Sequence, residues 1–103
     1  MITSQHWTDD GAPEGGQAFG NGFAIAWQRG PLGRDENRLA PNGAFVEEVI
    51  EACADRIAYY QQSPFACAEN EAALEHLAAA LDCLKSRTAR REAAGTEGTH
   101  EGA

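Results

Sequence analysis

Four cations lie close together in the segment 84–95, LKSRTARREAAG, of a chain whose formal net charge is -8. They are Lys85, Arg87, Arg90 and Arg91. Arg87 and Arg91 are four positions apart, so their guanidinium groups emerge from one face of a helix. Planar groups at this spacing can hold phosphate oxygens through paired hydrogen bonds. The same cations could instead only complement the negative end of a helix dipole, worth about 0.3 to 1 kcal/mol each, and the spacing alone leaves both interpretations open.

A second group of candidate binding residues lies in the segment YYQQSPF and just after it. Tyr59, Tyr60 and Phe65 offer aromatic faces, which stack on nucleobases for about 1 to 3 kcal/mol each. Asn70 follows, and its amide can hydrogen-bond an adenine edge. Alternatively, Tyr60 and Phe65 only pack a helix corner and Asn70 caps a helix. A helical hairpin would place this group far from the arginines, so a shared pocket requires a second subunit packed antiparallel.

Neither a hydrolytic nor a metal-binding constellation is present in the sequence. The three histidines, His6, His76 and His100, are far apart in the sequence. The three cysteines, Cys53, Cys67 and Cys83, are an odd number and lack CxxC spacing. We therefore expect buried, reduced thiols and neither a disulfide framework nor a zinc site. No glycine-rich loop matches a P-loop or a dinucleotide fingerprint. The sequence predicts a protein without catalytic residues, metal or cofactor.

Two stretches, roughly residues 44–62 and 68–93, carry nearly all the periodic apolar pattern and predict helices. Asn42 is a suitable N-cap for the first, and the short connection SPFACAE forces the second to return antiparallel. The first predicted apolar stripe comprises Val46, Val49, Ile50, Cys53, Ile57 and Tyr60. The second comprises Ala73, Leu77, Ala80 or Leu81, Leu84 and Thr88. Gly95 is expected to end the second helix.

The part of the chain before the helices predicts only a small β element. Residues 1–21 are rich in glycine and poor in apolar residues, as in a flexible N-terminal arm. In residues 23–28 apolar side chains alternate, which predicts a half-buried strand, and residues 34–42 form a polar loop. The predicted fold class is α+β, mainly α: an antiparallel two-helix hairpin with a small N-terminal β element in residues 22–94, followed by a flexible tail, 95–103. One pair of helices gives a thin core, so we expect a homo-oligomer.

The acidic net charge disfavours general DNA or RNA binding, because it repels phosphate backbones. No apolar run approaches the ~20 residues that span a bilayer, and the first residues, MITSQHWTDDGAPEGG, lack the basic start and apolar core of a signal peptide. We expect a soluble, cytoplasmic protein with no membrane partner.

An ordered set of motifs extends this interpretation: AIAWQRGPLG, NGAFVEEVI, YYQQSPF, AEN and RTARRE. Over about residues 23–99 the chain resembles small phage proteins that share an antiparallel helical hairpin and sequester cyclic nucleotide immune signals. These are the anti-Thoeris sponge family and the related anti-CBASS sponges. The strand with its WQ-x-GP turn resembles the anti-Thoeris branch. The resemblance implies capture, without degradation, of glycocyclic ADP-ribose made by a TIR-domain enzyme, by a homodimer or homohexamer in the cytoplasm of the infected host.

The same resemblance implies a role for individual residues. Arg87 and Arg91 would hold the diphosphate, Asn70 would contact the adenine and the ring of Tyr60 would stack on it. Two further candidates for ligand binding are Phe65 and the loop residue Arg34. Two alternatives stay open: a sponge for the cyclic dinucleotides or trinucleotides of CBASS, and a helical oligomerisation or adaptor module in which the arginines only complement a helix end.

Overall fold

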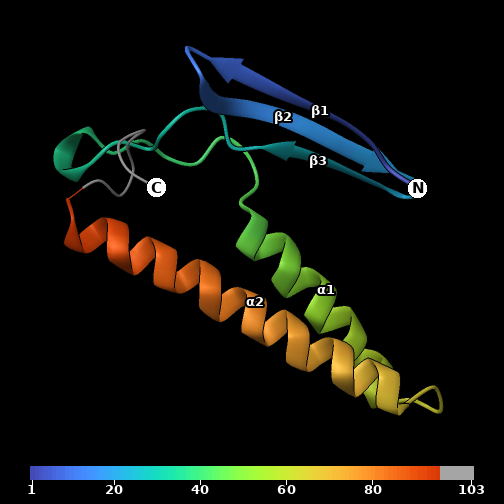
Figure 1. Cartoon of the computed structure of the whole chain (residues 1–103). Coiled ribbons are helices and arrows are strands. Elements are labelled where there is room, and N and C mark those ends of the chain that lie inside the picture. Colours follow the sequence, from blue (N-terminus) through green and yellow to red (C-terminus); the bar gives the residue numbers. More distant parts are fainter. Residues whose placement is uncertain (96–103) are drawn as a thin grey trace. The chain divides into compact units, whose positions relative to one another are not determined.

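The computed structural model of the chain describes residues 1–95, which form a three-stranded antiparallel sheet and then two long helices (Figure 1). In chain order the elements are β1 (Thr3–Asp9), β2 (Ala12–Gly20), β3 (Phe23–Trp27), the 3-10 helix η1 (Asp35–Asn37), α1 (Val46–Gln61) and α2 (Ala68–Ala93). The chain divides into two compact units, one with the sheet and one with the helical hairpin. The predicted fold class, mainly α with an N-terminal β element, is confirmed.

Residues 3–20 form β1, β2 and the turn between them, so the expectation of a flexible arm in residues 1–21 is wrong. Asp10 and Gly11 join these strands and both have positive φ, 51° and 81°. A two-residue turn with this backbone matches the twist of antiparallel strands. Gly22, with φ of 85°, lies in the turn between β2 and β3. The glycines therefore shape hairpins, and they do not signal mobility.

β2 is the central strand, and its small residues lie opposite the large residues of β3. Phe23 pairs with Gly20, Ile25 with Ala18 and Trp27 with Gly16, which confirms that the three apolar residues share one face. Within residues 1–95, only Gly16 and Ala18 are buried. A Cβ on Gly16 would overlap the carbonyl oxygen of Gln5 on β1, so this position requires glycine. The sheet is held by close backbone approach and not by a large core.

Side chains of Gln28 and Asn42 close the loop between β3 and α1. The Asn42 amide accepts from the backbone N–H of Arg29 at 2.8 Å and donates to the Arg29 carbonyl at 3.1 Å. The backbone N–H of Asn42 donates to Gln28 Oε1 at 2.8 Å. The prediction that Asn42 caps the first helix is therefore wrong, because α1 begins at Val46 and the amide instead satisfies both backbone groups of Arg29.

The hairpin turn between α1 and α2 is fastened by two side chains. The Gln61 amide accepts from the backbone N–H of Cys67 at 3.0 Å and donates to its carbonyl at 3.1 Å. Ser63 Oγ donates to the Tyr60 carbonyl at 2.6 Å and accepts from the N–H of Phe65 at 3.1 Å. These bonds satisfy backbone groups that helix ends leave open, and they let α2 return antiparallel to α1 (Figure 1).

Both helices expose more apolar surface than the sequence pattern suggests. The α2 residues predicted to face α1 are all half-buried: Ala73, Leu77, Ala80, Leu81, Leu84 and Thr88. On α1, Val49, Ile50 and Ile57 are half-buried, whereas Val46, Cys53 and Tyr60 are exposed. The three cysteines are reduced but exposed, so the prediction of buried thiols is wrong for the single chain: one helix cannot cover every apolar face of its partner. Gly95, at φ of 76°, follows the end of α2 as expected, and the rest of the predicted tail lies outside the described residues.

Candidate ligand-binding site

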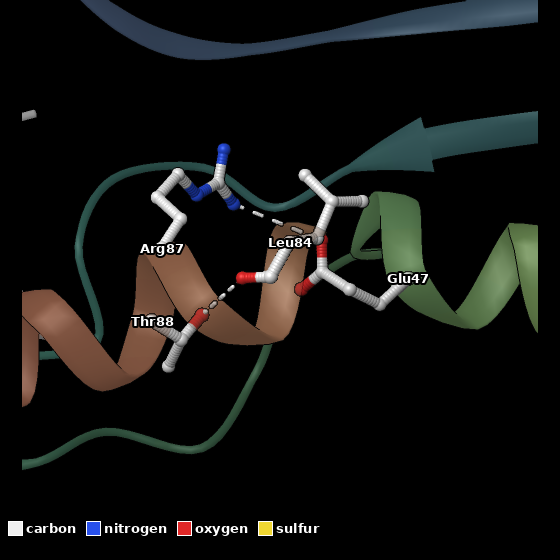
Figure 2. Close-up of polar contacts among 4 residues, drawn as sticks. All are labelled: Glu47, Leu84, Arg87 and Thr88. Carbon is white, nitrogen blue, oxygen red and sulfur yellow. Dashed lines mark hydrogen bonds and ion pairs between the residues drawn. The ribbon is translucent and has the colours of Figure 1, made fainter. Parts of the chain in front are cut away.

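Arg87, on the last third of α2, forms an ion pair with Glu47 at the start of α1 (Figure 2). Arg87 Nη2 lies 3.7 Å from Glu47 Oε1, and the two side chains are 51% and 27% exposed. Beside it, the Thr88 hydroxyl donates to the Leu84 carbonyl at 3.3 Å, so that polar side chain is directed back onto its own helix. The ion pair joins the first turn of α1 to the far end of α2, as the antiparallel hairpin requires. The sequence pattern did not identify Glu47 as a partner of Arg87.

The ion pair between Arg87 and Glu47 is weaker than the interaction that a phosphate group would make with Arg87. Ion pairs exposed to solvent contribute about 0.2 to 1 kcal/mol, because water screens the charges and two flexible side chains lose freedom. A charge-assisted hydrogen bond from arginine to a phosphate contributes about 1.5 to 3 kcal/mol. A bound diphosphate would therefore displace Glu47 from Arg87 with a net gain.

Arg91 lies one turn beyond Arg87 on α2, which is continuous from Ala68 to Ala93. The four-residue spacing therefore lies within regular helix, and the two guanidinium groups emerge from the same side of α2. Arg91 is half-buried, whereas Arg87 is exposed. This end of α2 provides the charged half of the candidate site.

The aromatic half lies at the opposite end of the hairpin, around the turn. Asn70, in the first turn of α2, donates from Nδ2 to the Phe65 carbonyl at 3.3 Å, and it is half-buried. Phe65 is 77% exposed and Tyr60 is 36% exposed. Asn70 therefore braces the turn in the single chain, while the rings of Tyr60 and Phe65 remain exposed. The packed corner that was the alternative for Phe65 is not formed within this chain.

A residue that the sequence interpretation passed over, Arg56, lies against the rings of α1. Its guanidinium carbon is 5.1 Å from the ring centroids of both Tyr59 and Tyr60. Its Nε donates to the Tyr60 hydroxyl at 3.3 Å, and this hydrogen bond raises the pKa of Arg56 above its ordinary value. The spacing of three and four residues in the stretch RIAYY was the available signal.

One chain does not bring the two halves together. Asn70 and Arg87 are seventeen residues apart on α2, which separates them by about 26 Å along the helix axis. Arg34, the other candidate, precedes η1 with extended backbone in the unit that contains the sheet. The expected distance between turn and arginines within one chain is confirmed for Tyr60, Phe65 and Asn70.

In residues 1–95, neither helix combines the length and the apolar composition that a membrane span requires.

Comparison with known proteins places this architecture in a family. The model of the Acb2/Tad1 hairpin domain matches residues 21–89, so the chain belongs to that family. The matched range takes in β3, the loop, α1 and most of α2, with Tyr60, Phe65, Asn70 and Arg87.

A curated relative is the protein named Thoeris anti-defense 1 from Bacillus phage SBSphiJ7. It is 47% identical to this chain over 77 residues, which is 75% of this chain and 51% of the relative. The chain thus spans about half the length of the relative it matches.

Proposed function

We propose that this protein is a phage anti-defence protein that binds a cyclic nucleotide immune messenger and withholds it from the host effector without degrading it. The messenger is glycocyclic ADP-ribose from the TIR-domain enzyme of a Thoeris system, and the protein acts in the cytoplasm of the infected bacterium. The observation that carries the proposal is the family match over residues 21–89, a range that contains five of the six candidate binding residues. The 47% identity to a Thoeris anti-defence protein supports the choice of messenger.

The geometry of the hairpin supports a pocket shared between two chains. Arg87 and Arg91 of one chain would hold the diphosphate, while Tyr60 and Asn70 of a second chain, packed antiparallel, would receive the adenine. Phe65 and Arg34 would complete the pocket. The exposed stripe of Val46, Cys53 and Tyr60, spaced seven residues apart on α1, offers apolar surface for such a contact.

The charge of the chain fits a small anionic ligand better than a nucleic acid polymer. A net charge of -8 repels a long phosphate backbone, which would lie across the acidic surface. A compact dinucleotide presents its phosphates at one place, so a local pair of arginines is sufficient to hold it. The same acidic surface thus favours selectivity for a small messenger.

The test is direct recovery of the ligand. The protein is purified from cells in which a TIR-domain enzyme makes glycocyclic ADP-ribose, it is heat-denatured, and the released small molecules are identified by mass spectrometry. We expect the intact cyclic messenger in amounts comparable to the protein. Recovery of only a linear product would indicate hydrolysis. The empty protein is also tested by thermal shift against each messenger. If only cyclic dinucleotides or trinucleotides stabilise it, its ligand is a CBASS messenger and not glycocyclic ADP-ribose. If no messenger stabilises it, the adaptor module is favoured.

Mixing two defective chains tests whether the pocket is shared. Arg87→Ala and Tyr60→Ala chains should each bind no messenger. When they are unfolded together and refolded as a mixture, a two-chain assembly with random exchange should recover about one quarter of the wild-type sites, because one of the two sites in each mixed dimer is intact. Failure of the mixture to bind, with assembly preserved, would contradict a pocket built from both chains.

A further inference from the structure

Arg56 is held by aromatic groups and not by a carboxylate. In residues 1–95 it has no ion-pair partner, although the chain is acidic and Asp55 precedes it directly. Its guanidinium carbon lies 5.1 Å from the ring centroids of Tyr59 and Tyr60, and Nε donates to the Tyr60 hydroxyl at 3.3 Å. A cation within about 6 Å of a ring centroid is attracted by the negative face of the ring.

The two rings and the guanidinium form one cluster, which we call the Arg56 cluster (Arg56, Tyr59 and Tyr60). The ring centroids are 6.3 Å apart and the ring planes are tilted by 55°. Tilted rings at this distance are in direct aromatic contact, and the guanidinium lies within reach of both, so the three groups support one another. All three residues lie within one turn of α1, and all three are exposed.

A ring that is already oriented in the empty protein binds its ligand more tightly, because no side-chain conformational entropy is lost on binding. Tyr60 is 36% exposed, and the structure gives its hydroxyl a single described contact, the bond from Arg56. The cation on one side and the hydrogen bond at the tip together restrict the ring of Tyr60.

We infer that Arg56 is a positioning residue for messenger capture: it orients the ring of Tyr60 so that the free part of the ring receives the base. The inference rests on the proposed function, in which Tyr60 stacks on the adenine. It adds a residue that touches the ring and not the ligand. It also assigns Tyr59 a role as the second support of the guanidinium.

The first experiment compares full-length Arg56→Gln and Arg56→Lys with the wild type by calorimetric titration of glycocyclic ADP-ribose. Because Tyr60 would then have to be ordered on binding, Arg56→Gln should lose about two- to tenfold in affinity. Arg56→Lys should restore little of it, because an ammonium is a point charge that cannot bridge two rings. Arg29→Gln, in the unit with the sheet, removes the same charge and a cation–ring contact with Trp7, and it should bind within about twofold of the wild type.

The second experiment is independent of the ligand. In NMR experiments on the empty protein, the Arg56 Hε should exchange with water more slowly than in Tyr60→Phe, which lacks the hydroxyl that accepts its hydrogen bond. Rescue of affinity by Arg56→Lys, or unchanged affinity in Arg56→Gln while the wild type binds, would overturn the inference and leave the proposed function intact. A wild-type protein that binds no messenger would overturn both. Equally fast exchange of the Arg56 Hε in both proteins would show that the cluster is not formed and would overturn the inference alone.

Discussion

On the proposed function, replacement of Glu47 by glutamine should strengthen messenger binding, because Glu47 would compete with the phosphates for Arg87. Two unit charges 3.7 Å apart attract by about 1 kcal/mol in bulk water and by about 4 to 5 kcal/mol at an effective dielectric constant of 20. Arg87 is 51% exposed, so the interaction belongs near the lower limit, and measured pairs of this kind contribute about 0.2 to 1 kcal/mol. Removal of this competition predicts a gain in affinity of up to about fivefold.

The assay is calorimetric titration of glycocyclic ADP-ribose into Glu47→Gln and into a matched control, Glu48→Gln. Glu48 is the next residue on α1, it is exposed and it does not pair with Arg87, so both variants change the net charge equally. The difference between the two variants should decrease in 1 M salt, where the screening length of about 3 Å is shorter than the ion-pair distance.

Two results would refute this reasoning. Weaker binding by Glu47→Gln would show that the carboxylate orients Arg87 for the ligand and does not compete with it. An equal gain in both variants would show that only the net charge matters. The same variant should lower the free energy of unfolding of the hairpin by less than about 1 kcal/mol, because the lost ion pair is exposed.

Three further predictions concern the frame that carries the site. Gly16→Ala should lower the melting temperature far more than Gly11→Ala. The Gly16 variant adds a clash with the Gln5 carbonyl oxygen, whereas Gly11 has open space around it and its variant carries only a backbone cost of about 1 kcal/mol. Equal shifts in thermal unfolding would contradict this. Asn42→Ala should increase hydrogen exchange at the Arg29 amide by tenfold or more, and Asn42→Asp, which retains the acceptor, should restore much of the protection. Gln61→Leu should destabilise the helical hairpin by about 1 to 3 kcal/mol in chemical unfolding followed by circular dichroism, since two backbone groups of the turn lose their partner.

The helices could be predicted from the sequence because their signal is local and repeated. Apolar residues at steps of three and four, together with strong helix formers, extend over sixteen residues in α1 and twenty-six in α2. The turn at Ser63 and Pro64 interrupts the pattern clearly. These features determine the hairpin without any information on distant contacts.

The strands β1 and β2 were not predicted because glycine occurs both in flexible segments and in tight hairpin turns. Counted as composition, the glycines of residues 1–21 indicate mobility, but the pairs Asp10-Gly11 and Asn21-Gly22 are also strong hairpin signals at defined positions. Within β2, glycine permits a backbone approach that depends on the register with β1, which no local pattern reveals. Asn42 was wrongly predicted as an N-cap for a similar reason: its partner, Arg29, lies thirteen residues away in the sequence.

The candidate site could be predicted only as two separate groups, and the structure explains why. Arg87 and Asn70 are set about 26 Å apart by the rigid length of α2, so no rearrangement of one hairpin can join them. On the shared-pocket proposal, ligand binding and self-association are then thermodynamically linked, because the ligand binds only chains that are paired. Apparent affinity should rise with protein concentration until pairing is complete, and the ligand should in turn stabilise the assembly. In the sequence of a single chain, the proposed site is therefore visible only as residue types, and its geometry would arise only when exposed surfaces such as Val46 and Cys53 contact a second copy.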